Sequence, residues 1–161
     1  MARRDASSTC LRRRALFLLG QKQGDRTELL LLNAARSDPD AEIREQAIFW
    51  LGQSSSPRAA AVLDSILRTS TDTKIQVHAI FSLAQMNRAT AGPVLRTYAG
   101  RTDVDREVRD QAVFWLGQSN NAEDSQFLRD LYRRESDEGV KDRILFSVAQ
   151  NSRDRAATGP W

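Results

Sequence analysis

Apolar residues recur along this chain with the spacing of amphipathic helices. In the segment 42–54 (EIREQAIFWLGQS), Ile43, Ala47, Trp50 and Leu51 follow the order i, i+4, i+7 and i+8, which places them on one helix face. Segments with the same pattern begin at residues 10, 42, 74, 107 and 139, so their starts are 32 or 33 residues apart. The second and fourth segments agree at ten of thirteen positions, which adds a longer period of 65 residues. Such regularity predicts an array of structural repeats.

A second, weaker helical pattern lies between these segments. The intervening stretches share a leucine at matched positions (Leu31, Leu63, Leu95 and Leu128) and are bounded by short polar loops. We therefore expect each repeat to hold two antiparallel helices, a first-type helix followed by a second-type helix. A lone pair cannot bury its apolar face, so the pairs should stack into a solenoid. An aspartate two residues before each of the last four second-type segments favours the helix start by capping it: Asp40, Asp72, Asp105 and Asp137.

The repeats predict an all-α fold, an α-solenoid of antiparallel helix pairs with about nine helices. We expect one array over residues 8–151, with second-type helices near 8–22, 40–53, 73–86, 105–118 and 138–150, and tails at 1–7 and 152–161. Apolar residues at the two ends, from Leu16 to Leu19 and from Ile144 to Val148, would stay open in this array. This predicts end-to-end self-association, docking of a partner, or a longer parent solenoid.

The acidic turn Asp38-Pro39-Asp40, followed by Ile43-Arg44, Ala47 and Leu51-Gly52, carries a family resemblance. The fourth segment repeats it as Asp105, Val108-Arg109, Ala112 and Leu116-Gly117. This unit resembles the HEAT-repeat family, in particular the short HEAT-like repeats of the phycobilisome-lyase type. The resemblance implies a scaffold that binds macromolecules along a concave surface lined by second-type helices. Two positions depart from the family pattern: Trp50 and Trp115 replace a small residue, and a phenylalanine replaces a polar one.

That phenylalanine stands in all five repeats, and a glutamine follows it one helical turn later: Phe17, Phe49, Phe81, Phe114, Phe146 and Gln21, Gln53, Gln85, Gln118, Gln150. A helical wheel places the position of Gly52, always small, and that of Glu45 on an open face. One interpretation is a binding groove with a phenylalanine ridge and a trough of small residues. The other is that the phenylalanines and glutamines join successive repeats, which we favour because a stacked helix has neighbours on both flanks. The binding candidates are Glu45, Phe49, Gln53, Phe81, Gln85, Asp110, Phe114 and Gln118.

Composition argues against an enzyme. The 161 residues include one cysteine and one histidine, which excludes a disulfide framework, a cysteine-based zinc site and a multi-histidine metal site. We expect Cys10 to be an ordinary thiol, His78 and the tryptophans to be structural, and the chain to have no catalytic residues, metal or cofactor. No apolar run approaches the roughly 20 residues that span a bilayer. As written, the chain is expected to be cytoplasmic; a longer parent would leave the compartment open.

The net charge of +3 is concentrated at the start of the chain. Residues 1–36 hold eight basic and three acidic residues, and this basic end makes Arg12, Arg13 and Arg14 candidates for binding nucleic acid or phosphate. The positions equivalent to Arg13 are, however, Glu45, Val77, Asp110 and Asp142. A track for nucleic acid should repeat its basic residues along the array, so a protein partner is the favoured expectation and nucleic acid the alternative.

Overall fold

The computed structural model describes residues 2–22, 24–54 and 56–157, with side chains at 8–22, 24–54 and 56–150. Regular secondary structure in this part of the chain is entirely helical, which confirms the predicted all-α fold. The nine described helices are α1 (Ala2–Gly20), α2 (Asp25–Ser37), α3 (Ala41–Gln53), α4 (Pro57–Thr69), α5 (Thr73–Gln85), α6 (Arg88–Gly100), α7 (Arg106–Gln118), α8 (Ala122–Arg134) and α9 (Glu138–Ala157).

The helices are grouped in two compact units, Met1–Ala91 (unit 1) and Gly92–Trp161 (unit 2). A single array over residues 8–151 stays a prediction. At the ends, α1 begins at Ala2 and α9 ends at Ala157, so residues 2–7 and 152–157, expected in tails, are helical.

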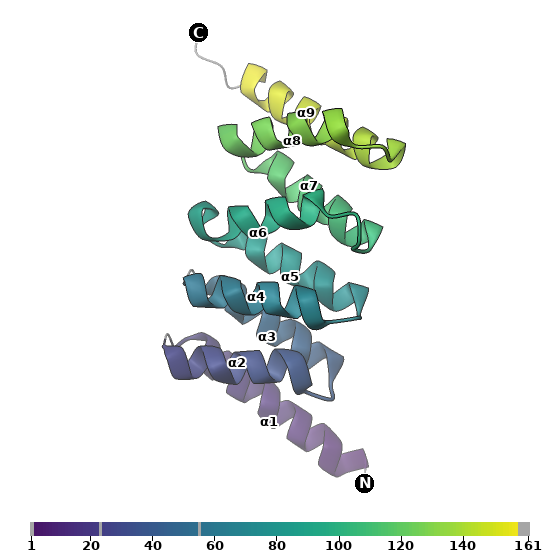
Figure 1. Cartoon of the computed structure of the whole chain (residues 1–161). Coiled ribbons are helices and arrows are strands. Elements are labelled where there is room, and N and C mark those ends of the chain that lie inside the picture. The colour runs from purple at the N-terminus through teal and green to yellow at the C-terminus, as the bar shows by residue number, and fades with distance from the viewer. Residues whose placement is uncertain (1, 23, 55, 158–161) are drawn as a thin grey trace. The chain divides into compact units, whose positions relative to one another are not determined.

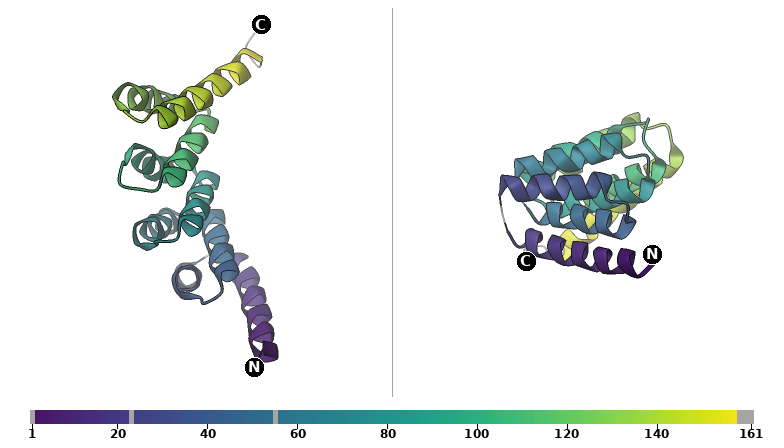
Figure 2. Two further views of the ribbon diagram at one scale, coloured as in Figure 1. Left: turned by 90° about the vertical axis from the view of Figure 1, so that its right-hand side faces the viewer. Right: turned by 90° about the horizontal axis from the view of Figure 1, so that it is seen from below.

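Each unit has two layers of helices, as expected for stacked pairs. In unit 1 the first-type helices α2 and α4 lie side by side, and the second-type helices α1, α3 and α5 form the other layer (Figures 1 and 2). Within that layer α1 packs against α3, and α3 packs against α5. In unit 2 α7 packs against α9, and α8 contacts both. These are segments of the predicted α-solenoid.

The predicted aspartate caps are present at the second-type helices. The carboxylates of Asp40, Asp72 and Asp105 each accept a bond of 2.9 Å from the backbone N–H two residues later. Asp137 accepts in the same way from Gly139, also at 2.9 Å. Each bond satisfies one of the N–H groups that a helix start leaves without a partner, so these recurring aspartates mark where the helices begin.

The core includes three of the four positions that the periodicity selected on the segment 42–54. On α3, Ile43, Ala47 and Leu51 are at most 1% exposed. Their counterparts on the next two second-type helices are buried as well: Ile75, Ala79, Leu83, Val108, Ala112 and Leu116.

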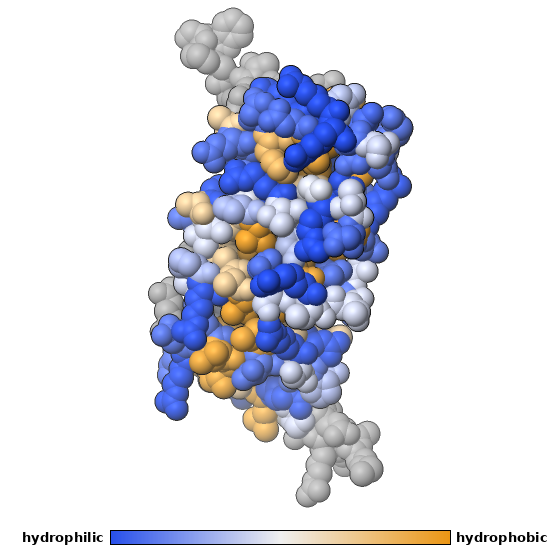
Figure 3. Space-filling view, in the orientation of Figure 1, coloured by the Kyte–Doolittle hydropathy of each residue, from blue (hydrophilic) through white to orange (hydrophobic). Residues whose placement is uncertain are grey.

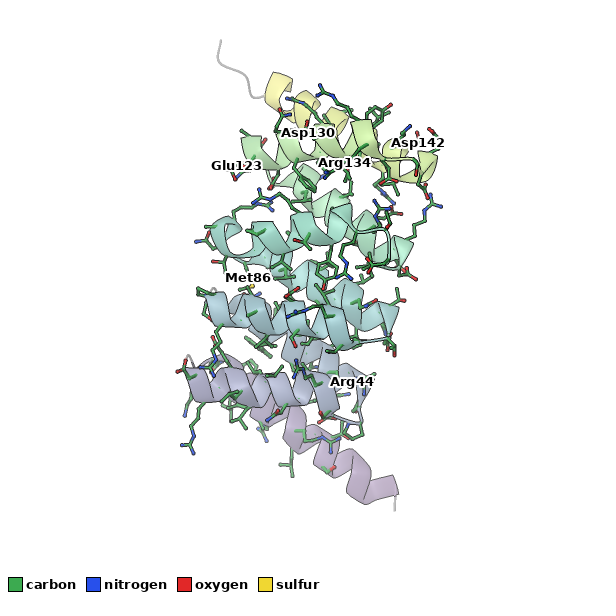
Figure 4. All side chains as sticks on the ribbon, viewed as in Figure 1. Arg44, Met86, Glu123, Asp130, Arg134 and Asp142 are labelled. Carbon is green, nitrogen blue, oxygen red and sulfur yellow. The ribbon has the colours of Figure 1, made fainter. Side chains whose placement is uncertain are left out.

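A long polar side chain on the second-type helix donates hydrogen bonds to the carbonyl groups at the C-terminal end of the first-type helix before it. Arg44 Nη1 donates to the carbonyl of Asp38, the C-cap of α2, at 2.6 Å, and Figure 4 shows Arg44 beside that end of α2. Gln76, at the equivalent position of α5, donates to the carbonyl of Ser70, the C-cap of α4, at 3.0 Å. The last carbonyls of a helix have no partner within it, so these bonds join the two helices of a repeat.

In unit 2 the equivalent residue, Arg109, adds a buried ion pair. Its Nε and Nη2 donate to the carbonyl of Ala99 near the end of α6, at 3.3 and 3.2 Å. Nη2 also pairs with Glu135 at 2.5 Å, and only 7% and 6% of the two side chains are exposed. Burial alone would raise the pKa of Glu135. A bond from the Asp137 N–H and the Arg109 guanidinium outweigh burial and hold that pKa below its ordinary value, so Glu135 is charged in the folded unit.

Candidate partner-binding surface

The phenylalanines of unit 1 are exposed to solvent. Phe17, Phe49 and Phe81 are 51%, 44% and 38% exposed, whereas Ile48, on the other flank of α3, is fully buried. Because α1, α3 and α5 are successive neighbours, these rings form a row across one layer of the unit. Gln53 and Gln85 are exposed one turn further along α3 and α5, and Gln21 is exposed directly after the end of α1. We call these six residues the Phe–Gln row.

Trp50 joins two of these phenylalanines. Its ring lies edge-on to Phe17, with centroids 5.9 Å apart, and to Phe49, with centroids 5.4 Å apart. The sequence interpretation placed Trp50 towards the core as filling. The structure instead places it half-buried between α1 and α3, over Gly20. The spacing of i+7 predicted a core direction for Trp50, and Gly20 at the end of α1 was the signal that its ring lies between α1 and α3.

Unit 2 carries the same residue types with different exposure. Phe114 is half-buried and packs edge-on against Trp115 at 5.1 Å, while Phe146 is 59% exposed. Gln118 Nε2 donates to Gln150 Oε1 at 3.2 Å, which joins α7 to α9. The glutamines of this unit therefore do connect successive helices, while their amides stay at the surface.

Two of the five small residues do not form an open trough. Gly52 and Gly117 are both buried where second-type helices approach each other. A Cβ at Gly52 would lie 2.7 Å from Ser82 Cβ, and a Cβ at Gly117 would overlap Ser147. The interpretation of this position as an open groove floor is wrong for these two glycines. A helical wheel gives an angle on one helix, but not the place of the next helix.

Glu45 is engaged within the protein. Its carboxylate lies 3.1 Å from Lys74 Nζ and 3.6 Å from His78 Nε2, so it joins α3 to α5. The pair Arg13–Glu42 joins α1 to α3 with the charges reversed. Asp110, the counterpart of Glu45 in unit 2, is half-buried, and its Oδ1 has no hydrogen-bond partner among the described atoms. A ligand at Glu45 would therefore compete with an ion pair.

Two of the three arginines proposed to bind nucleic acid are likewise paired with carboxylates. Arg12 Nε lies 3.2 Å from Asp38, and Arg13 contacts Glu42. Arg14 is exposed. The guanidinium groups of Arg12 and Arg13 are therefore less available to phosphate, because a phosphate oxygen would have to displace a carboxylate from each.

The remaining reactive side chains form no cluster in the described part of the chain. Cys10 is exposed, and no group of three or more His, Cys, Asp or Glu side chains there could hold a metal ion. None of the described helices combines the length and the apolar character needed to cross a membrane.

Comparison with known protein families agrees with the repeat structure. The family model described as HEAT repeats matches residues 2–75 and again residues 65–149, which together cover most of the chain. The match is to HEAT repeats in general and does not single out the phycobilisome-lyase type. A comparison with curated proteins gave no significant match. Repeated helix pairs, aspartate caps, a shared core pattern and two family matches lead to one conclusion: the chain belongs to the HEAT-repeat family.

Proposed function

We propose that this protein is a non-catalytic scaffold that binds a protein partner along its second-type helices. HEAT repeats generally mediate protein–protein interaction, and their helical solenoids are typically non-enzymatic. The observation that carries the proposal for this chain is the exposure of Phe17, Phe49 and Phe81 in one row.

The chemistry of the row fits a protein partner. Large aromatic side chains held by their neighbours supply binding energy at little cost in conformational entropy, and such residues dominate interfaces. The exposed glutamine amides both donate and accept hydrogen bonds, which suits a polypeptide backbone. In unit 2 the same role falls to Phe146 on α9, together with Phe114 and Gln118 on the neighbouring helix α7. Glu45 would tune specificity beside the row in unit 1, and Asp110 would do so on α7 in unit 2.

The test is a capture experiment with the full chain as bait. Partners are compared, with and without nuclease, between the wild type and the double variant Phe49→Ser, Phe81→Ser, since both rings are exposed. Leu29→Ser is the matched control, because Leu29 is 45% exposed but lies on the first-type helix α2. We expect the double variant to lose the partner with its thermal midpoint nearly unchanged, and the control to keep it.

Two other outcomes would assign a different role to these residues: unfolding of a variant, or partners that depend on nucleic acid. Phe49→Ser with Phe114→Ser extends the test to unit 2. If either double variant unfolds, the packing interpretation of the phenylalanines is correct. Partners that vanish on nuclease treatment and on Arg14→Ala would assign the function to nucleic acid at Arg12, Arg13 and Arg14.

A further inference from the structure

In two repeats an arginine of the second-type helix faces an acidic residue that caps the next first-type helix. Arg12 Nε lies 3.2 Å from the carboxylate of Asp38, the C-cap of α2. Arg109 Nη2 lies 2.5 Å from the carboxylate of Glu135, the C-cap of α8. The acid follows the arginine by 26 residues in both pairs, and the two carboxylate side chains are only 10% and 6% exposed. The place beside this arginine thus holds a nearly buried carboxylate in two repeats.

The backbone holds the second oxygen of each of these carboxylates. Oδ1 of Asp38 accepts from the Asp40 N–H at 2.9 Å, and Oε1 of Glu135 accepts from the Asp137 N–H at 3.0 Å. Asp40 and Asp137 are themselves the capping aspartates of the next second-type helices. A capping aspartate two residues away therefore does not keep a carboxylate out of this place.

The repeat between these two has the arginine but not the acid. Its C-cap, Ser70 at the end of α4, accepts from the Asp72 N–H at 3.2 Å, as the two acids accept from theirs. The arginine, Arg44, donates through Nη1 to the carbonyl of Asp38 at 2.6 Å. Its guanidinium forms no ion pair with a carboxylate of residues 8–22, 24–54 or 56–150, although Arg44 is half-buried.

A hollow of about 340 Å³ lies beside Arg44, where the other two repeats hold their acid. Its lining includes buried apolar side chains, two guanidinium groups and a hydroxyl group: Ile66, Ile75, Arg36, Arg44 and Ser70. Asp72 lines it as well, with its Oδ1 engaged at the start of α5. In Figure 3 apolar and hydrophilic residues lie side by side over α2 and α4, and Figure 4 shows Arg44 beside the end of α2. Two guanidinium groups against one carboxylate give this hollow a net positive charge.

We infer that the hollow binds a carboxylate carried on a short aliphatic stem, in the place that Asp38 and Glu135 fill in the other repeats. The Arg44 guanidinium has further N–H groups for charge-assisted hydrogen bonds to it, and the Ser70 hydroxyl can donate another. The buried isoleucines Ile66 and Ile75 contact the stem. A glutamate side chain of a protein partner and a free monocarboxylic acid share this chemistry. The hollow shares no residue with the Phe–Gln row, so this inference is independent of the proposed function.

Two probes test the hollow: sodium butyrate and the tripeptide Ala-Glu-Ala with both ends blocked. Each is titrated into the ¹⁵N-labelled full chain at constant ionic strength, and the backbone amide signals of residues 70–72 report binding. We expect saturable shifts with a dissociation constant of about 1–10 mM. Butyramide and the blocked tripeptide Ala-Gln-Ala, which lack the carboxylate, should leave these signals unchanged.

Three variants locate the binding. Arg44→Gln should weaken it at least about tenfold, because the positive charge is lost. It should stay folded, since Gln76 at the equivalent position still donates to the end of its preceding helix. Ser70→Glu should abolish binding by placing the chain's own carboxylate in the hollow. Arg26→Gln is the matched control, because Arg26 is an exposed arginine at the other end of α2, and it should leave the affinity unchanged.

The outcomes separate the two sources of the carboxylate. Tighter binding of the glutamate tripeptide assigns the hollow to a side chain of a protein partner, and tighter binding of butyrate assigns it to a free acid. The inference is overturned if neither probe shifts the signals up to about 100 mM. It is also overturned if Ser70→Glu binds the probes as the wild type does, or if Arg44→Gln and Arg26→Gln weaken binding equally.

Discussion

Units 1 and 2 carry near-copies of one segment, residues 42–54 and 107–119, and differ in what surrounds these copies. In unit 2 Arg109 reaches Glu135, the C-cap of α8, in a buried ion pair. In unit 1 the corresponding C-cap, at the end of α4, is Ser70. There Arg44 and Ser70 line a hollow of about 340 Å³.

Unit 1 places its ion pairs elsewhere. Glu45 pairs with Lys74 near the surface, where solvent screens the attraction, and Arg13 pairs with Glu42. The comparison teaches that a nearly identical helix can be held by a buried pair or by exposed ones. Which kind of pair forms depends on the residue 26 positions after the arginine, which lies outside the copied segment. This residue is Glu135 in unit 2 and Ser70 in unit 1. Four experiments can break or sharpen this contrast, beginning with the largest expected effect.

Removing the buried arginine should cost most. Arg109→Ala leaves the Glu135 carboxylate and the Ala99 carbonyl without their main partner, and we expect about 3 kcal/mol of lost stability. Arg44→Ala, the matched change in unit 1, removes one bond to a carbonyl and should cost about 1 kcal/mol. Urea unfolding of both variants measures the difference. Equal losses would show that the buried pair adds nothing beyond the helix cap.

The second-largest loss of stability is expected from substitutions at the two buried glycines. Gly52→Ala and Gly117→Ala each force a methyl group into a closely packed contact and should cost about 2 kcal/mol. Ser147→Gly should restore most of the stability of Gly117→Ala, because the closest obstacle there is the Ser147 Cβ.

Ser82→Gly should restore less in Gly52→Ala. The Ser82 backbone Cα and O would also lie 2.9 Å from the new Cβ, and they remain when the side chain is removed. Thermal melts of the four variants test this asymmetry, and equal rescue in both units would contradict it.

Acid should weaken unit 2 through its carboxylates. The pKa of Asp137 is lowered chiefly by the Val140 N–H bond, and that of Glu135 is lowered as well. A carboxyl group with a lowered pKa stabilises the fold above its unfolded pKa, and this contribution is lost as the pH falls below about 4. We expect the thermal midpoint to fall in that range, less steeply in Glu135→Gln. Parallel pH profiles for the two proteins would count against the role of Glu135.

The smallest expected effect is a gain. Ser70→Glu gives unit 1 the carboxylate that Glu135 supplies in unit 2, beside Arg44 and the hollow. The new side chain can still accept from the Asp72 N–H, as Ser70 does at 3.2 Å. We expect about 0.5 kcal/mol of added stability at low salt and less at high salt. Ser70→Gln is the uncharged control, and an equal gain there would show that filling space, not charge, stabilises the unit.

Much of the local structure could be predicted, and the reason is periodicity. Ile43, Ala47 and Leu51 were selected as core by helical spacing alone, and the aspartate before each second-type helix located its start. For the candidate surface, the repeat identified Phe49 and Gln53 but left their exposure open, because spacing along one helix cannot tell a covered flank from an open one.

The sequence by itself determined the repeat, its two helices, their caps and their buried stripe, since these depend on residues within one or two helical turns of each other. Only the tertiary structure decided that Gly52 is a contact point, that Trp50 bridges two phenylalanines, that Glu45 is paired and that Leu11 is exposed in the described part of the chain. Each of these depends on where a neighbouring helix lies, which is set by the packing of side chains from separate repeats.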